Sequence, residues 1–176
     1  MSSVLDFESL VTRFQRDLYH FALSLTGHET QACDLVQETF YIWATKGNQL
    51  RDSRMVKSWL FTTLHREFFQ TLRHRDRYCD EDVNELEADL PAVPPDTLTR
   101  LDSATALQCL ATLEERYRAP IALYYLEDYS YLEISSILGI PLGTVQSRIA
   151  RGKTQLLRML TAAPIAGNHP GGTHDS

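Results

Sequence analysis

The stretch of sequence that decides the fold is residues 131–151, which read Tyr131-Leu-Glu-Ile-Ser-Ser-Ile-Leu-Gly-Ile-Pro-Leu-Gly-Thr-Val-Gln-Ser-Arg-Ile-Ala-Arg. A short helical run ends at Gly139, which can take the left-handed conformation of a tight turn. Ile140 is placed to fill the angle between two helices, and Pro141 discourages continuation of the first one. The stretch therefore predicts a helix-turn-helix.

The second helix of this motif is predicted to open at Thr144, with Val145 and Ile149 facing inward. The polar residues around that buried pair then face outward, near the part of the helix that would enter a major groove. The candidate DNA-contacting residues are Thr144, Gln146, Ser147, Arg148, Arg151 and Lys153. The plainer alternative is a tight hairpin of two core helices with solvated arginines.

Charge is distributed unevenly along the chain, whose formal net charge is -6. Residues 134–160 hold four bases and no acid, and residues 51–77 hold seven bases against three acids. Residues 80–99 between them hold seven acids and no base. Because an acid on a DNA-facing surface is repelled by phosphate, the two basic segments are compatible with DNA binding.

Helical spacing of apolar residues extends through most of the chain, and no period-two alternation persists, so we predict an all-α fold. The predicted helices cover roughly 4–26 with a cap at Gly27, 31–47 after an N-cap at Thr30, 54–77, 98–110, 116–127, 131–138 and 144–160. Pro120 suggests that the fifth of these starts late or is kinked. An acidic, proline-containing stretch without apolar period separates two helical lobes. The predicted organisation is a domain over 1–78, a linker over 79–96, a domain over 97–160 and a disordered tail over 161–176.

Several classes of protein are excluded by what the 176 residues lack. No apolar run approaches the roughly 20 residues of a membrane span, and the first residues do not form a secretory signal. Three widely spaced cysteines, Cys33, Cys79 and Cys109, indicate free thiols in a reducing cytoplasm, expected to be buried and inert. No zinc-binding spacing or glycine-rich phosphate loop occurs, so we expect no metal site, no cofactor and no enzymatic activity.

With the lobes and the motif in place, the sequence over roughly 5–160 resembles the extracytoplasmic-function (ECF) group of bacterial RNA polymerase sigma factors. Asp34-Leu-Val-Gln-Glu-Thr-Phe is similar to the family's region two, which docks on the clamp helices of the largest polymerase subunit. The resemblance implies that Asp34, Gln37 and Glu38 bind core polymerase. These three side chains fall within about one helical turn and share one face.

The stretch Ser58-Trp-Leu-Phe-Thr-Thr-Leu-His-Arg-Glu-Phe-Phe, followed by Arg73-His-Arg-Asp-Arg, resembles the part of the family that melts and reads the minus-ten promoter element. That task needs aromatic surface for unstacked bases and cations for the backbone. The candidates are Phe68, Phe69, Arg73, Arg75 and Arg77. Trp59 and Phe61 are expected to pack in the core instead.

In the second lobe, Leu113-Glu-Glu-Arg-Tyr-Arg-Ala-Pro-Ile-Ala-Leu-Tyr-Tyr-Leu-Glu-Asp and the helix-turn-helix resemble region four. Region four reads the minus-thirty-five element and binds the polymerase flap tip. The family also implies promoter DNA as a ligand, an anti-sigma protein as a partner and a cytoplasmic location.

Two other functions remain open at this point. A stand-alone helix-turn-helix regulator would bind duplex DNA as a dimer, without polymerase. A pure interaction module would bind a sigma inhibitor without supporting transcription. Reconstitution with core polymerase distinguishes both from a sigma factor.

Overall fold

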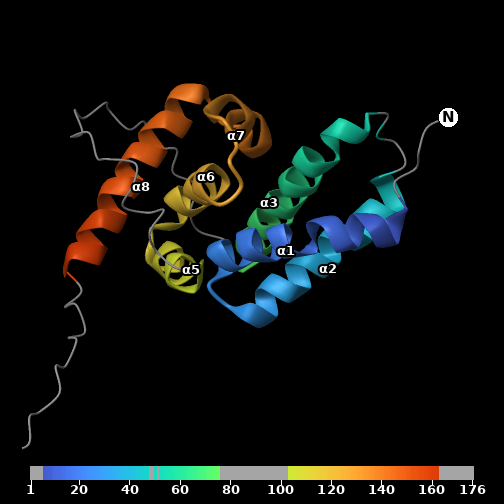
Figure 1. Ribbon diagram of the computed structural model, residues 1–176, viewed down its shortest axis with the longest axis horizontal. Coiled ribbons are helices and arrows are strands. Elements are labelled where there is room, and N and C mark those ends of the chain that lie inside the picture. The colour runs from blue at the N-terminus through green and yellow to red at the C-terminus, as the bar shows by residue number, and fades with distance from the viewer. Residues whose placement is uncertain (1–5, 48–49, 51, 76–102, 163–176) are drawn as a thin grey trace, which may run out of the picture.

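The computed structural model describes residues 6–47, 50, 52–75 and 103–162. No strand occurs among these residues, and the all-α prediction is confirmed. The helices are α1 (Phe7–Thr26), α2 (Glu29–Lys46), the short 3-10 helix η2 (Ser53–Met55), α3 (Val56–Arg75), α5 (Ser103–Thr112), α6 (Glu115–Tyr125), α7 (Tyr131–Leu138) and α8 (Leu142–Ala162). Figure 1 shows α1–α3 on one side of the molecule and α5–α8 on the other.

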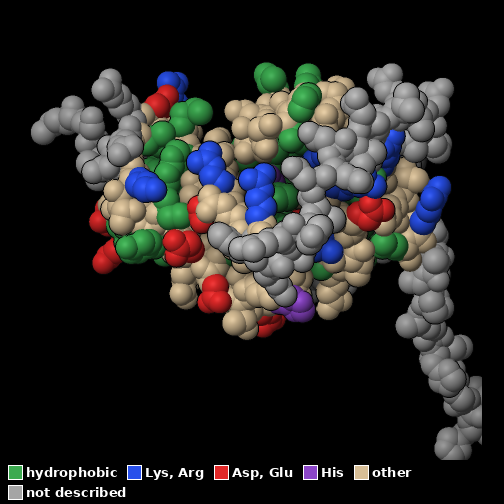
Figure 2. All heavy atoms as spheres, turned by 180° about the vertical axis from the view of Figure 1, so that it is seen from behind, with side chains coloured by type: hydrophobic (Ala, Val, Ile, Leu, Met, Phe, Trp, Pro, Cys, Tyr) green, Lys and Arg blue, Asp and Glu red, His purple; other side chains and the backbone are tan. Residues whose placement is uncertain are grey.

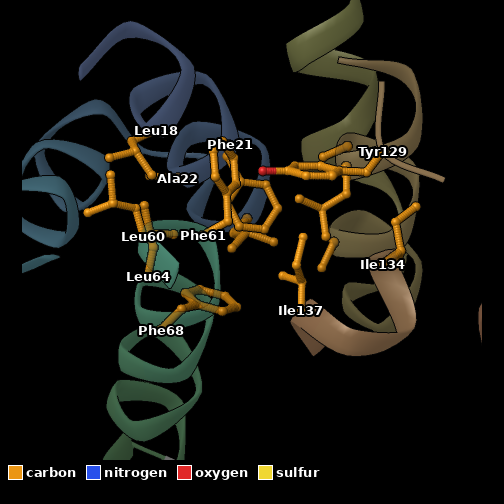
Figure 3. Close-up of a cluster of buried hydrophobic side chains, with 14 of the residues drawn as sticks. Leu18, Phe21, Ala22, Leu60, Phe61, Leu64, Phe68, Tyr129, Ile134 and Ile137 are labelled. Atoms are coloured by element: carbon orange, nitrogen blue, oxygen red, sulfur yellow. The ribbon is translucent and has the colours of Figure 1, made fainter. Parts of the chain in front are cut away.

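The first half is built from α1, α2 and α3, each of which buries one apolar face. Leu18 and Phe21 of α1 meet Leu60 and Phe61 of α3 in the centre of this core (Figure 3). The aromatic rings of Phe21 and Phe61 lie 5.2 Å apart between centroids. Phe61 is fully buried and Trp59 is half-buried against Trp43, so the prediction that both pack in the core is confirmed.

Two boundaries in the first half depend on single residues. Gly27 closes α1 in the predicted left-handed conformation, with φ of 69°. The predicted N-cap of α2 at Thr30 is wrong, because the residue before the helix is His28 and α2 begins at Glu29. The chain turns at the left-handed Gly27. The carbonyl of the next residue, His28, therefore accepts the first hydrogen bond of α2, from the N–H of Ala32.

The second half is built around α6, which packs against α7 and α8. Helix α6 does not start late: it begins at Glu115 and contains Pro120 in its buried part. It ends at Tyr125, two residues before the predicted end. Helix α8 is longer than predicted at both ends, and it includes the first two residues of the predicted tail. The rest of that tail and the whole predicted linker lie outside the described residues.

The two halves are not separate in this structure. Helix α1 packs against α5 and α6, and α3 packs against α7. One continuous cluster of buried residues therefore runs from Leu18 in the first half to Ile134 and Ile137 in the second (Figure 3). Two helical halves are present, as predicted, and they share an interface that the prediction did not include.

Candidate functional site

The face of α2 that points away from the core carries the three candidate polymerase-binding residues. Asp34, Gln37 and Glu38 are all exposed, whereas the opposite face of the helix is buried against α1 and α3. Tyr41 lies on the same outward face, one turn further along, and 65% of its surface is exposed. Tyr41 was not among the predicted binding residues, although its spacing of three residues from Glu38 and seven from Asp34 places it on their face of the helix.

Cys33 lies next to this face and is exposed, so the expectation of a buried thiol is wrong for that residue. Its position at the border between the buried and outward faces of α2 leaves its side chain exposed. Cys109 is half-buried, and Cys79 lies outside the described residues.

The packing of α3 gives the candidate minus-ten residues different degrees of exposure. Phe68 is 7% exposed and packs in the core, so its ring is not available to a base in this arrangement (Figure 3). Phe69 is half-buried, with its ring 4.6 Å from that of His65 and 5.5 Å from that of Phe68. Arg73 is exposed. The side chain of Arg75 and all of Arg77 lie outside the described residues.

The predicted helix-turn-helix is present. Helix α7 starts with a capping box in which the Ser130 hydroxyl accepts from the Glu133 N–H at 3.3 Å and the Glu133 carboxylate accepts from the Ser130 N–H at 2.8 Å. It ends at Gly139, which is left-handed as predicted. Two hydrogen bonds that the sequence did not reveal hold the turn. The Ser135 hydroxyl donates to the carbonyl of Ile140 at 2.7 Å, and the Val145 N–H donates to the carbonyl of Pro141 at 3.1 Å.

This last bond explains why α8 begins at Leu142 and not at Thr144. Proline lacks an N–H but keeps its carbonyl, so Pro141 can accept the first hydrogen bond of the helix. Val145 and Ile149 are buried, as predicted. The six candidate residues on α8 occupy the other faces of the helix: Gln146 is exposed, and Thr144, Ser147, Arg148, Arg151 and Lys153 are half-buried.

A groove with a cavity volume of about 660 Å³ lies between α3 and the second half. Helix α3 contributes Arg66, Phe69 and Arg73, and α8 contributes Arg148. Figure 2 shows Lys and Arg side chains spread across the middle of one face of the molecule. Candidate residues for two different promoter elements, Phe69 with Arg73 and Arg148, therefore line one groove.

Electrostatics within the groove reflect this proximity. Burial and, secondarily, the positive charge of Arg148 lower the pKa of His65 to about 4. His65 is therefore neutral at pH 7, and its imidazole adds no positive charge beside Arg148. The neutral imidazole packs against the Phe69 ring at an interplanar angle of 59°, so the two rings form a tilted aromatic pair in the groove.

Among the described residues, no helix is both long and apolar enough to cross a membrane. In that part of the chain, no group of three or more His, Cys, Asp or Glu side chains is placed to hold a metal ion.

Both halves of the chain match families of known proteins. Residues 10–78 match the family model Sigma-70 region 2, and residues 103–156 match the model Sigma-70, region 4. The chain is 31% identical over 134 residues to the ECF RNA polymerase sigma factor SigL of Mycobacterium tuberculosis, covering 75% of this chain and 76% of SigL. It is 28% identical over 166 residues to SigW of Bacillus subtilis, also an ECF RNA polymerase sigma factor, covering 88% of each chain.

A solved structure is similar as well. The sigma factor RpoE from Bartonella quintana, in a co-crystal structure with the anti-sigma factor NepR, matches with a TM-score of 0.68 and 27% sequence identity. The match covers 92% of this chain and 100% of RpoE. The resemblance thus extends over the arrangement of both halves, since one superposition covers them together.

Proposed function

Because the chain belongs to the ECF group of RNA polymerase sigma factors, we propose that it binds core RNA polymerase and directs transcription from promoters that its two halves select. The observation that carries this function is the presence of region two and region four in one chain, in family order. A stand-alone regulator is not favoured, because the relatives that match over both halves are sigma factors.

The outward face of α2 is the proposed polymerase-binding surface. Asp34, Gln37 and Glu38 supply two carboxylates and an amide within about one turn, and Tyr41 supplies exposed aromatic surface beside them. Exposed tyrosines are frequent energetic centres of protein interfaces, because the ring buries a large area at little entropic cost. The clamp helices of the largest subunit are the proposed partner.

The outer end of α3 is the proposed minus-ten surface. Phe69 offers a ring to an unstacked base, and Arg73, with Arg75 and Arg77 further along the chain, offers cations to the phosphates. Phe68 is proposed to hold the Phe69 ring in position, since the two rings contact edge to face.

Helix α8 is the proposed recognition helix for the minus-thirty-five element. Gln146 and Arg148 are the types of side chain that read base edges, whereas Thr144, Ser147, Arg151 and Lys153 suit phosphate contacts. The second half is also proposed to bind the polymerase flap tip.

We further propose an anti-sigma protein as a partner, supported by the structure of RpoE with NepR. The proposed location is the cytoplasm, where polymerase acts, and the chain is proposed to have no enzymatic activity of its own.

The α2 surface is tested by the affinity of the full chain for core polymerase. We expect Gln37→Ala with Glu38→Ala to weaken binding by more than about 1 kcal/mol, the usual threshold for an important interface residue. Tyr41→Ala alone is also expected to weaken binding to core polymerase. The matched control is Glu8→Ala with Gln15→Ala on α1, which removes the same chemistry from exposed positions elsewhere. Equal affinities for the two double variants would contradict this part of the proposal.

A further inference from the structure

Helix α8 begins with a row of exposed, uncharged side chains. Leu142, Gln146 and Ala150 follow one another at intervals of four residues, and all three are exposed. Because residues i and i+4 lie one above the other on a helix, the three form a single stripe, called here the neutral stripe. Before Arg158, the exposed residues of α8 are those of the neutral stripe and Gly143 beside it. Figure 1 shows α8 along the outer side of the second half, with its first turns beside α7.

The exposure of the neutral stripe does not come from loose packing of the helix. Val145 and Ile149, in the same turns, are 0% and 3% exposed, whereas the apolar Leu142 is 41% exposed. A Cβ atom at Gly143 would meet nothing within 4 Å, so no contact inside the chain requires glycine there. Glycine at this exposed position lets the backbone of the first turn approach a ligand closely.

The charged side chains of α8 lie around the neutral stripe and are all basic, because the helix contains no acid. Arg148 is half-buried and lines the groove beside α3, and Lys153 follows the stripe one turn further along. Ser147 and Arg151 place a hydroxyl and a cation on the neighbouring face. A DNA major groove has uncharged base edges on its floor and phosphates along both sides. The arrangement on α8 is complementary to such a groove.

We propose that the neutral stripe determines the sequence specificity of α8, with Gln146 reading an adenine and Leu142 reading the methyl group of a nearby thymine. A glutamine amide accepts from the adenine N6 amino group and donates to N7 at the same time. Thymine carries the apolar methyl group of the major groove, which apolar side chains contact. The methyl group of Ala150 continues the same surface. This proposal rests on the proposed function, because it takes α8 as the recognition helix.

Helix geometry limits how far apart the two bases lie. Residues four positions apart are separated by ~6 Å along an α-helix, which rises about 1.5 Å per residue. Successive base pairs are about 3.4 Å apart along the duplex. A helix that lies along the groove therefore places the Leu142 thymine and the Gln146 adenine about two base pairs from each other.

The test couples each side chain to one chemical group of the DNA. A promoter is first selected with the reconstituted holoenzyme from a linear library in which the upstream element is randomised. Each thymine of the selected element is then replaced singly by deoxyuridine, which lacks only the methyl group. Each adenine is replaced singly by 7-deazaadenine, which lacks the N7 acceptor. The affinity of the holoenzyme for every duplex is measured with the unaltered chain, with Leu142→Ala and with Gln146→Ala.

With the unaltered chain, one deoxyuridine is expected to weaken binding about fourfold, the usual effect of exposing one methyl group. With Leu142→Ala, the same replacement is expected to have no effect. One 7-deazaadenine about two base pairs away is expected to weaken binding by about fivefold or more, and to have no effect with Gln146→Ala. The matched controls are Leu132→Ala on α7 and Gln15→Ala on α1, which remove the same side chains from other exposed positions. Both controls are expected to keep both losses.

The neutral stripe is refuted if no thymine or adenine is sensitive, or if the losses persist in Leu142→Ala and Gln146→Ala. Circular dichroism checks that the variants keep their helical content, and Leu142→Gln replaces Leu142→Ala if that variant does not.

The same measurements distinguish this proposal from the proposed function. If the holoenzyme starts no transcript but the chain alone selects a duplex from the library, the replacements are made in that duplex. The expected coupling would then support the neutral stripe and refute the proposed function. A chain that selects no sequence, alone or with polymerase, refutes both.

Discussion

Arg148 links the candidate recognition helix to the groove, since it lines the cavity opposite Arg73 and its charge acts on His65. Its spacing on α8, three residues from the buried Val145 and one from the buried Ile149, keeps it half-buried at the edge of the core. The sequence predicted this residue as a DNA contact. It contained no signal that Arg148 would also lie near α3, because that depends on contacts between segments far apart in the chain.

Arg148→Ala is expected to weaken recognition of the upstream promoter element by about 1–3 kcal/mol, the usual effect of losing an arginine that reads a base edge. The measurement is the affinity of the reconstituted holoenzyme for a promoter it uses, compared with the same promoter carrying a scrambled upstream element. Arg158→Ala, an exposed position on the same helix, is the control. If both variants discriminate equally well between the two promoters, Arg148 does not read the element.

Gly152 is a second residue whose role depends on a close approach. A Cβ atom at this position would lie 2.3 Å from the Ile121 Cδ1 and 2.9 Å from the Tyr117 Cβ, both on α6. Glycine therefore lets α8 pack closely on α6. From the sequence, Gly152 is only a weak helix former inside a helical pattern.

Gly152→Ala is expected to destabilise the protein by about 1–3 kcal/mol, the usual range for overpacking. Gly143→Ala on the same helix is expected to stabilise it by about 0.4–1 kcal/mol, because a Cβ there meets nothing within 4 Å. Urea unfolding of both variants checks the opposite signs. Equal effects of the two substitutions would show that α8 does not approach α6 so closely.

At the scale of elements, the presence of each described helix could be predicted, whereas the residues at which the helices begin and end could be predicted less accurately. Tyr131–Leu138 was predicted to the residue. The left-handed glycine at its end has a strong sequence preference, whereas the Ser130 cap at its start became apparent only in the structure. The start of α8 was missed by two residues because Pro141 acts there through its carbonyl, which has no sequence signature. The solvent-facing stripe of α2 was expected from the resemblance, and helical periodicity placed its three residues on one face.

The capping box of α7 gives the prediction at this scale. Ser130→Ala removes the hydroxyl that accepts from the Glu133 N–H, and the expected loss of stability is about 1 kcal/mol. Ser136→Ala, at an exposed position within the same helix, is expected to change stability by less than about 0.5 kcal/mol. Thermal unfolding of the two variants decides: a smaller loss for Ser130→Ala than for Ser136→Ala would contradict the cap.

At the scale of the whole molecule, the interface between the halves could not be predicted. Lys57 and Glu127, which form an ion pair across this interface, are charged, and charged residues normally indicate solvent. Tyr129 and Phe61 would be buried in any helical core, so their apolar character does not reveal which half they contact. The relative placement of α3 and α7 is fixed by side-chain fit, for which a single sequence has no periodic signal.

Two largely buried groups at the interface between the halves make the stability of the folded chain depend on pH, with opposite signs. Burial raises the pKa of Glu127 to about 7, partly opposed by Lys57, while Asp17 and Asp128 raise it further. Because protonated Glu127 is the form that the folded chain favours, its contribution to stability is full below the ordinary carboxyl pKa of 4.5 and is lost as pH rises through about 7. The lowered pKa of His65, about 4, acts in the other direction. Its contribution is present above pH 6.5 and is lost as pH falls toward 4.

We therefore expect Glu127→Gln and His65→Gln to show opposite pH dependences of stability. In Glu127→Gln only His65 of these two groups titrates, so the free energy of unfolding measured in urea falls as pH is lowered from 7 to 5. In His65→Gln the carboxyl of Glu127 remains, so the free energy of unfolding rises over the same interval. Each unit of pKa difference corresponds to about 1.4 kcal/mol of this free energy. Parallel titration curves for the two variants would contradict the assignment.

The most direct test of the function is run-off transcription from linear promoter DNA with purified core polymerase. We predict a discrete transcript only when the chain is added, and its loss when either the upstream or the minus-ten element of that promoter is scrambled. A chain that binds promoter DNA by itself but yields no transcript with core polymerase at any promoter tested would contradict the account.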